Sequence, residues 1–258
     1  MKVYPTPKIR NIALIAHGGS GKTTLAEAML YNTGATTRLG KVDDGNTVSD
    51  FLPEEIKRKI SISTSLVPCE YRDHKINILD TPGFADFLGE VRAAVKVADN
   101  ALVVVSAVAG VEVQTEMFWE EAQDLPKVVF VNRMDRENAN FYKTLDDLRD
   151  KFSGTIVPLQ LPIGAEASFK GVVDLLKMKA LIFEPGSGKY KEEEVPADMM
   201  ADVESFKEQL IEAAAEGNDE LLVKYLEGEE LTDEEIRSGI GRSIQRFGGF
   251  RILRFGSE

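Results

Sequence analysis

The spacing of apolar and polar residues changes several times along this chain of 258 residues. Four short apolar runs of strand length, rich in β-branched residues, occupy residues 9–16, 75–79, 101–107 and 127–131. Segments with apolar residues at helical spacing alternate with these runs, at residues 23–31, 84–98, 113–122 and 138–152. Strands that alternate with helices form a mostly parallel sheet with helices on both faces, so this order predicts an α/β fold.

Between the first helix and the second of these strands the pattern is less regular. Residues 36–53 are polar, punctuated by glycine and without a clear period. A loop of this length in a compact domain is usually functional or mobile. Residues 60–71 are predicted to form a further strand, joined to the strand at 75–79 by a tight turn.

The pattern changes again after residue 155. A strand-like run at 156–163 and an apolar stretch at 171–183 are followed by a turn with Pro and Gly at 184–191. Two amphipathic helices come next, and then a third helix that begins with a capping box of Thr232 and Glu235. We therefore expect residues 158–246 to form an inserted α+β subdomain, and residues 1–157 and 247–258 to form the core.

The first strand leads into the sequence AHGGSGKTT, which precedes a helix. The glycines of this loop allow successive backbone N–H groups to point at phosphate oxygens, and the helix presents its positive end to them. Lys22 would then reach the outer phosphates, and the Thr23 hydroxyl would hold Mg²⁺. The usual pattern has glycine where this chain has Ala16, so the motif alone is also compatible with a plain turn.

A second motif, DTPG, follows the strand at 75–79. Asp80 at its start can bind Mg²⁺ through water, and Gly83 at its end can offer its N–H to a terminal phosphate. Alone, this sequence is also typical of a turn that ends a strand.

A third motif, NRMD, follows the strand at 127–131. Asp135 can accept two hydrogen bonds from the ring N–H and the exocyclic amine of guanine, which adenine cannot donate in that arrangement. A buried carboxylate left without these donors costs on the order of a few kcal/mol, which is enough for base discrimination. Asn132 would support the loop and Arg133 would cover the face of the base. The motif is short, and its weight comes from its place after the phosphate and magnesium motifs.

Composition is that of a globular protein, with 43% hydrophobic and 29% charged residues. The single cysteine, Cys69, cannot form an internal disulfide, and no signal sequence opens the chain, so a cytoplasmic location is expected. The longest apolar run, residues 101–111, has about half of the roughly 20 residues that a membrane helix needs. No membrane is therefore expected as a partner.

The net charge of −12 is concentrated in one region. Residues 192–236 hold 17 of the 43 acidic residues and only two lysines. Such a run is either a solvated helix face or a docking surface for a partner that presents basic residues.

The sequences AHGGSGKTT, RKISISTS, DTPGFADF and NRMD, with the insertion that begins LPIG, resemble the GTP-binding domain of elongation factor G and its elongation-factor-G-like paralogues. The resemblance covers essentially the whole chain and implies a P-loop GTPase domain with a mostly parallel twisted sheet. It also accounts for Ala16, because the family begins its phosphate loop with Ala-His.

The resemblance implies GTP and GDP as ligands, Mg²⁺ as cofactor, and hydrolysis of GTP to GDP and phosphate. Ser61 falls where the family has the threonine that completes magnesium coordination and senses the third phosphate, and serine keeps that hydroxyl. Lys22, Ser61 and Gly83 are the expected catalytic residues, and Thr23, Ser61 and Asp80 are the expected metal ligands. The expected nucleotide-binding residues are His17, Gly18, Gly19, Ser20, Gly21, Lys22, Thr23, Thr24, Asp80, Gly83, Asn132, Arg133, Asp135 and Ser257.

The acidic inserted region resembles the extra subdomain of the family, which implies contact with the stalk proteins of the large ribosomal subunit. The ribosome is therefore the expected partner, through residues 158–246, and no sequence-specific nucleic acid is expected. The barrel and ribosome-reaching domains that follow in the family are not part of this sequence, so translocation by this chain alone is not expected.

Three departures from the family pattern affect these expectations. The family reads DTPGH, and its histidine is expected to position the attacking water, whereas this chain has Phe84, which can neither donate to water nor accept from it. Gly19 stands where the family often has Asp, which loosens the loop without abolishing phosphate binding. The family closes its base pocket with Gly-Ser-Ala after a buried strand, whereas Arg251 and Arg254 interrupt that strand here and Gly-Ser-Glu follows.

Two functions are therefore compatible with the sequence. The first is a GTPase whose hydrolysis the ribosome stimulates. The second is a GTP-dependent ribosome-binding module with little or no intrinsic hydrolysis, because Phe84 replaces the family histidine. A P-loop protein that uses ATP is disfavoured by Asp135, and His17 is either a structural residue or a neighbour of the nucleotide.

Overall fold

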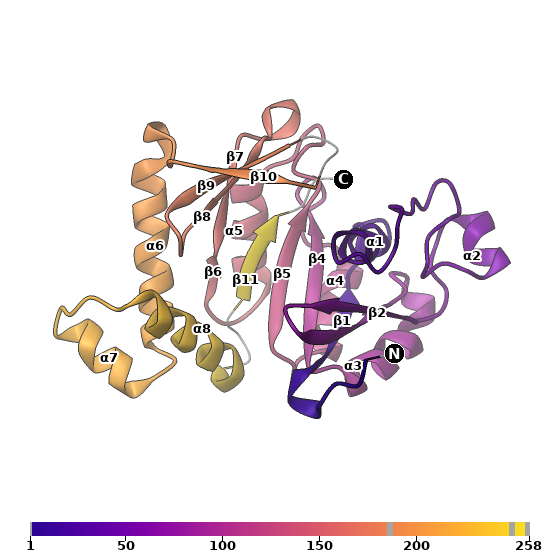
Figure 1. Ribbon diagram of the computed structural model, residues 1–258, viewed down its shortest axis with the longest axis horizontal. Helices are drawn as coiled ribbons and strands as arrows, with labels where there is room; N and C mark the ends of the chain where they lie inside the picture. Colours follow the sequence, from indigo (N-terminus) through magenta and orange to yellow (C-terminus); the bar gives the residue numbers. More distant parts are fainter. Residues whose placement is uncertain (1, 185–187, 248–250, 256–258) are drawn as a thin grey trace. The chain divides into compact units, whose positions relative to one another are not determined.

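The computed structural model describes residues 2–184, 188–247 and 251–255 (Figure 1). The chain divides into two compact units, and each is described by itself. The first unit consists of Met1–Val105 and Val111–Leu125, and the second of Ser106–Gly110 and Pro126–Glu258.

Three parallel strands and one antiparallel edge strand belong to the first unit, in the order β2-β3-β1-β4. Their bounds are Ile9–Ile15 for β1, Ser65–Tyr71 for β2, His74–Asp80 for β3 and Asn100–Ser106 for β4. The parallel pairing places Asp80 opposite Leu14, near the end of β1. The end of β3 and the loop that follows β1 therefore lie at the same edge of the sheet.

Helices cover both faces of these strands in the first unit. Leu30 of the first helix packs against Leu14 and Ile78 on one face. Ile15 points to the opposite face, where α3 and α4 contact β1, and it is fully buried. The helical elements are a 3-10 turn at Thr6–Lys8, α1 (Lys22–Asn32), α2 (Pro53–Arg58), a 3-10 turn at Ala85–Phe87, α3 (Leu88–Val97) and α4 (Val113–Glu121).

Three parallel strands of the second unit follow the order β5-β11-β6, so the last described strand lies between two earlier ones. Their bounds are Lys127–Asn132 for β5, Ile156–Pro158 for β6 and Arg251–Phe255 for β11. Between β5 and β6 the chain forms α5 (Phe141–Lys151), which buries Phe141, Leu145 and Leu148 on one face. Asn140 begins this helix and accepts the N–H of Lys143 at 3.0 Å.

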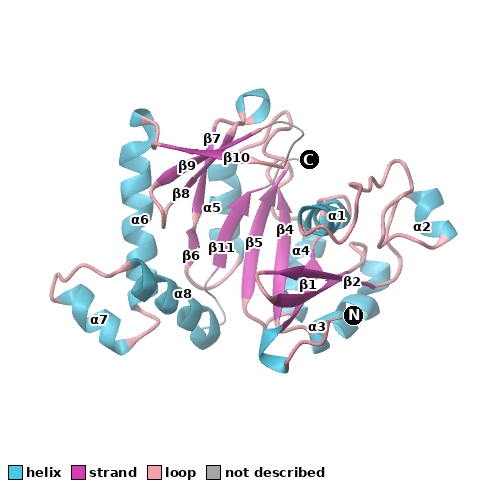
Figure 2. Cartoon of the chain, in the orientation of Figure 1, coloured by secondary structure: helices cyan, strands magenta, loops and turns pink. Residues whose placement is uncertain are grey.

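The second unit also holds a four-stranded antiparallel sheet and three helices (Figure 2). The sheet has the order β10-β9-β8-β7, and α6 contacts both α7 and α8. The bounds are β7 (Gln160–Ile163), β8 (Gly171–Asp174), β9 (Lys179–Phe183), β10 (Tyr190–Glu193), α6 (Met200–Ala215), α7 (Asp219–Leu226) and α8 (Asp233–Phe247), with 3-10 turns at Glu166–Ser168 and Ala197–Met199.

Close packing of α6 and α8 depends on a glycine. A Cβ built at Gly239 of α8 would lie 2.3 Å from the backbone oxygen of Ala214 in α6. The predicted capping box begins the same helix: the N–H of Thr232 donates to Glu235 at 2.9 Å, and the N–H of Glu235 donates to the Thr232 hydroxyl at 3.3 Å.

These elements confirm the predicted fold class, because the chain is a mixed α/β protein whose main strands are mostly parallel. The boundary of the inserted subdomain at residue 158 stays a prediction.

Two predicted strands differ from the structure. The strand expected at 60–71 begins only at Ser65, because the N–H groups of Ile62 and Ser63 donate to the Glu55 carboxylate instead of to a neighbouring strand. The run at 156–163 divides at Leu159 into β6, which is parallel to β11, and β7, which is antiparallel to β8. Both pieces are buried throughout, so their hydrophobic pattern has no period that could mark the change of sheet.

Candidate functional site

The loop between β1 and α1 has the backbone that the sequence predicts for a phosphate cradle. Gly19 has φ of 80° and Gly21 has φ of 101°, a left-handed conformation that glycine adopts without steric cost. Lys22 begins α1, and its buried Nζ donates to the carbonyl oxygens of Ala16 at 2.9 Å and His17 at 3.1 Å. The ammonium group therefore lies inside the loop.

Burial changes the charge balance of Lys22. Desolvation lowers the pKa of its ammonium group to about 8, and the carboxylates of Asp80 and Asp50 oppose this shift. A cation that burial has destabilised gains more from a bound anion than an exposed one does.

Thr23, Ser61 and Asp80 bring three oxygen-bearing side chains together beside this loop. The Thr23 hydroxyl donates to Asp80 Oδ2 at 2.8 Å, and the hydroxyl oxygens of Thr23 and Ser61 are 3.3 Å apart. Asp80 Oδ1 is buried and has no hydrogen-bond partner among the described residues. Burial raises the pKa of the Asp80 carboxyl to about 6, against the attraction of Lys22 and the hydrogen bond of Thr23.

Asp50 is a residue of the same cluster that the sequence analysis missed. It is buried, its Oδ1 also has no hydrogen-bond partner within the described chain, and burial raises the pKa of its carboxyl against the Ser61 hydroxyl and Lys22. It lies in the polar segment 36–53, where no period or motif distinguishes one acidic residue from another. The length of that segment is the only sequence signal that could have directed attention to it.

The chemistry of this cluster fits Mg²⁺. Two carboxylates and two hydroxyls supply hard oxygen donors, and two of the carboxylate oxygens are buried without a partner among the described residues. No group of three or more His, Cys, Asp or Glu side chains in the described chain could hold a metal by itself. Such a donor set is typical of a Mg²⁺ site that phosphates complete.

Gly83 and Phe84 lie directly against the phosphate loop. A Cβ at Gly83 would lie 2.5 Å from the Gly18 nitrogen and 2.6 Å from Lys22 Nζ, so only glycine fits there. A Cβ at Gly18 would lie 2.9 Å from the ring of Phe84, so this ring covers Gly18. The DTPG motif therefore borders the phosphate loop and is more than the end of a strand.

The His17 ring is held by the segment at the start of α4. Its Nδ1 is 2.8 Å from Gln114 Oε1 and its Nε2 is 3.3 Å from Glu112 Oε1, while the His17 N–H donates to the Thr115 hydroxyl. These contacts favour the structural interpretation of this histidine. Ser20 is buried in the loop, and Thr24 is a half-buried residue of the first turn of α1.

The NRMD residues belong to the second unit, at the end of β5. The Asn132 carbonyl accepts the N–H of Ala107 at 2.8 Å, and the Met134 carbonyl accepts the N–H of Glu166 at 2.8 Å. Arg133 has φ of 65°, an uncommon conformation for a residue with a side chain. Asp135 Oδ1 is buried and no described residue donates to it, as expected of an acceptor kept for a ligand.

The structure thus brings together Ser61, Asp80, Gly83 and the loop residues 17–24 within the first unit. The convergence of these residues with Asn132, Arg133 and Asp135 on one ligand stays a prediction. Ser257 lies outside the described residues.

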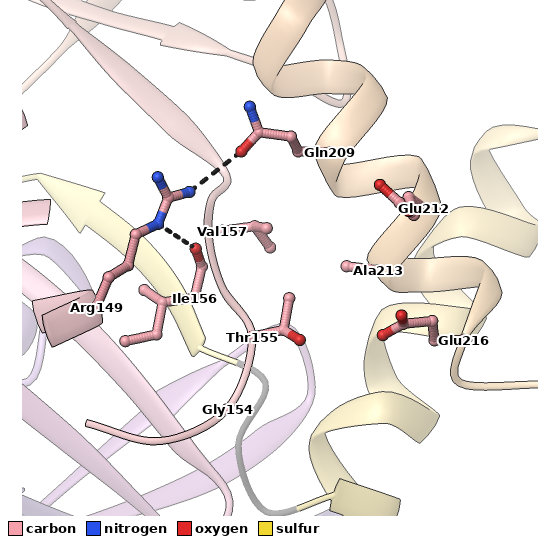
Figure 3. A pocket seen from close by; sticks show the side chains of 9 residues that line it. All are labelled: Arg149, Gly154, Thr155, Ile156, Val157, Gln209, Glu212, Ala213 and Glu216. Atoms are coloured by element: carbon pink, nitrogen blue, oxygen red, sulfur yellow. Dashed lines mark hydrogen bonds between the residues drawn. The ribbon is translucent and has the colours of Figure 1, made fainter. Parts of the chain in front are cut away.

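A cavity of about 400 Å³ in the second unit lies between α6 and the segment that leads into β6 (Figure 3). Arg149 spans it, donating from Nε to the Ile156 oxygen and from Nη2 to Gln209 Oε1, both at 3.1 Å. Glu212 and Glu216 line the opposite wall (Figure 3). None of the described residues predicted to bind nucleotide lines this cavity, so it is separate from the candidate site.

The sequence comparison matches most of the chain, including the phosphate loop and the NRMD loop, to one family. Residues 7–240 match the elongation factor Tu GTP binding domain. The chain belongs to this family. It is therefore a GTP-binding domain of the translational GTPases, a family of GTP hydrolases.

The solved structures contain a similar protein. The crystal structure of ttk003000868 from Thermus thermophilus matches this GTP-binding domain with a TM-score of 0.90 and 40% sequence identity. The match covers 97% of this chain and 37% of that one, so this chain spans well under half of the Thermus protein. In the described parts of the GTP-binding domain, no helix is long and apolar enough to cross a membrane.

Proposed function

We propose that this GTP-binding domain belongs to an elongation-factor-G-like protein and binds GTP and GDP with Mg²⁺, hydrolysing GTP in contact with the ribosome. One observation carries the proposal: the hydroxyls of Thr23 and Ser61 and the carboxylate of Asp80 meet beside a loop that encloses the Lys22 ammonium group. Each of these groups is of the type that a magnesium–triphosphate complex requires.

The phosphates would lie in the loop between Ala16 and α1. Backbone N–H groups and the positive end of α1 attract anions there, and Lys22 adds a buried positive charge. Gly83, where a Cβ would collide with Gly18 and Lys22, would offer its N–H to the third phosphate. Lys22 and Gly83 would thus stabilise the charge that develops during attack by water.

Thr23, Ser61 and Asp80 would hold Mg²⁺, with Asp80 acting through water. When bound, Mg²⁺ neutralises negative charge on the phosphate oxygens. The burial of Asp80 shields this carboxylate from bulk solvent, and the Thr23 hydroxyl fixes the direction in which it points. Asp50 is an additional carboxylate within the same cluster.

The base would be selected by the second unit. Asp135 has a buried oxygen that no described residue donates to, which supports its assignment as the acceptor for the guanine ring N–H and amine. Asn132 would support the loop from the end of β5, Arg133 would cover the base, and Ser257 would contribute at the last wall of the pocket.

The ribosome is the proposed partner, with residues 158–246 as the surface that contacts stalk proteins of the large subunit. The acidic run at 192–236 supports this assignment, because basic residues on a partner would complement it. The activity would take place in the cytoplasm.

A second candidate function rests on Phe84. Its ring lies against Gly18 and the residue is 36% exposed, so an apolar group stands where the family places a histidine. Loss of a group that positions water would slow hydrolysis by about a thousandfold, roughly 4 kcal/mol of barrier. On this account the domain is a GTP-dependent ribosome-binding switch with little hydrolysis of its own.

Turnover of GTP with and without ribosomes separates the two functions. Stimulation of about a hundredfold or more supports the GTPase. Binding to ribosomes that requires GTP, without such stimulation, supports the switch. In the second case Phe84→His should raise turnover, and Phe84→Leu, which keeps an apolar side chain, should not. A protein that neither binds ribosomes nor hydrolyses GTP would contradict both.

A further inference from the structure

The segment between α1 and β2 carries two residues of the candidate site and has little regular structure. Asp50 and Ser61 both belong to it, and α2 is its only described helix or strand. The Ser61 hydroxyl oxygen lies 3.3 Å from that of Thr23. Because α2 is the only regular element described here, side-chain contacts must fix the relative positions of the two ends of this segment.

Glu55 of α2 makes the contacts that do so. One carboxylate oxygen, Oε2, accepts the N–H of Leu52 at 3.0 Å. The other, Oε1, accepts the N–H of Ile62 at 2.9 Å and that of Ser63 at 3.1 Å. Leu52 is two residues after Asp50 and Ile62 is the residue after Ser61, so one side chain binds the backbone shortly after each of the two site residues.

The burial of Glu55 makes these bonds strong. The residue is only 1% exposed, whereas its neighbours Glu54 and Ile56 are exposed. Hydrogen bonds from backbone N–H groups to a charged carboxylate are among the strongest in proteins, and a buried partner left unpaired is costly. Glu55 therefore links the start of α2 to the backbone that precedes β2.

Glu27 of α1 holds the preceding part of the same segment. Its buried carboxylate accepts the N–H of Gly40 at 3.1 Å and that of Val48 at 2.5 Å. Val48 is two residues before Asp50. Glu27 thus fixes the segment to α1, and Glu55 sets the relative position of Asp50 and Ser61.

We propose that Glu55 is a positioning residue, which holds Asp50 and Ser61 beside Thr23 through the backbone that follows each of them. The proposal rests on the proposed function, in which Ser61 senses the third phosphate and its metal. It implies that Glu55 affects the affinity for GTP and leaves that for GDP largely unchanged, although its side chain contacts neither.

The test measures the dissociation constants of GDP and of a non-hydrolysable GTP analogue at fixed Mg²⁺. Glu55→Gln keeps the size of the side chain but replaces one acceptor oxygen with an NH₂ group that faces backbone N–H donors. We expect about a tenfold weaker affinity for the analogue and less than a twofold change for GDP. The matched control is Glu54→Gln, which removes the same charge from an exposed position of the same helix and should change neither constant.

A combined variant distinguishes positioning from a general loss of stability. In a background that carries both Asp50→Ala and Ser61→Ala, Glu55→Gln should reduce the affinity for the analogue by less than twofold, because both groups that it positions are already absent. Two results would overturn the proposal: additive losses of analogue affinity in the combined variant, or an equal loss of affinity for GDP and for the analogue in Glu55→Gln. If Glu55→Gln does not fold, Glu55→Asp, which keeps the charge and shortens the side chain, is judged by the same criteria.

Hydrogen exchange in the nucleotide-free protein gives a readout that does not depend on nucleotide binding. The amides of Ile62 and Ser63 should be protected in the wild type and should exchange at least tenfold faster in Glu55→Gln. A wild type that binds neither GDP nor the analogue would overturn the proposed function, and the positioning role with it. If the wild type binds both nucleotides and Glu55→Gln does not selectively reduce the affinity for the analogue, the positioning role alone is overturned.

Discussion

Lys22 and Asp80 are both buried. Burial lowers the pKa of the Lys22 ammonium group and raises that of the Asp80 carboxyl, so in each case it favours the neutral form. This arrangement costs folding free energy in the absence of a ligand. Ligand binding would offset that cost, because phosphates bring negative charge to Lys22 and a metal ion brings positive charge to Asp80. Buried ionisable residues whose pKa values are strongly shifted in this way are typical of functional sites.

The pH dependence of stability follows from Asp80. Its pKa is raised from 3.8 to about 6 in the folded chain, so the folded state holds more protons than the unfolded state between these values. Stability of the nucleotide-free protein should therefore fall as pH rises from about 4 to 6, by about 3 kcal/mol from this group alone. Urea unfolding across this range should show a correspondingly smaller fall in Asp80→Asn. The exposed Asp86→Asn should behave as the wild type, and equal slopes in all three proteins would contradict the assignment.

At the scale of single residues, the sequence was informative where a motif has fixed spacing. Lys22, Thr23 and Asp80 were predicted because the phosphate loop and DTPG each follow a strand, and the structure brings these three residues together. Asp50, Glu27 and Glu55 were missed, because their effect arises from burial and from hydrogen bonds to distant backbone groups. Neither quantity has a local sequence pattern.

At the scale of elements, the spacing of apolar residues predicts most helices and strands, and the exceptions have physical causes. The strand β2 starts late because side-chain carboxylates bind the backbone before it. The segment 171–183 contains two strands, β8 and β9, because Asp174 accepts the N–H groups of Leu176 and Lys177 and so forms a turn between them. Competition from side chains for backbone hydrogen bonds thus sets these boundaries.

The contact between α6 and α8 gives a prediction at this scale. Gly239→Ala places a Cβ 2.3 Å from the Ala214 carbonyl oxygen and should destabilise the protein by about 1–3 kcal/mol, because the helices must separate. Gly241 lies on the same helix with nothing within 4 Å of its Cβ position. Gly241→Ala should therefore stabilise by about 0.5–1 kcal/mol through helix propensity. Thermal or urea unfolding of the two variants checks this, and equal effects would show that the close approach does not matter.

At the scale of the whole molecule, the alternation of strands and helices correctly predicted the α/β class, and family membership agrees with the order of the motifs. The change from one sheet to another at Leu159 was not predictable, because residues on both sides are buried. The residues of the phosphate loop and its neighbours belong to the first unit and the NRMD residues to the second, so the binding of one guanine nucleotide by both sets stays a prediction.

Competition binding with GTP, ATP and xanthosine triphosphate tests this claim most directly. The wild type should prefer GTP to ATP by about 100-fold, because only guanine supplies both donors to Asp135. In Asp135→Asn the preference should move to the xanthosine nucleotide, whose carbonyl matches the new amide donor. Equal affinity for ATP and GTP, or an unchanged base preference in Asp135→Asn, would contradict a guanine nucleotide bound by both sets of residues.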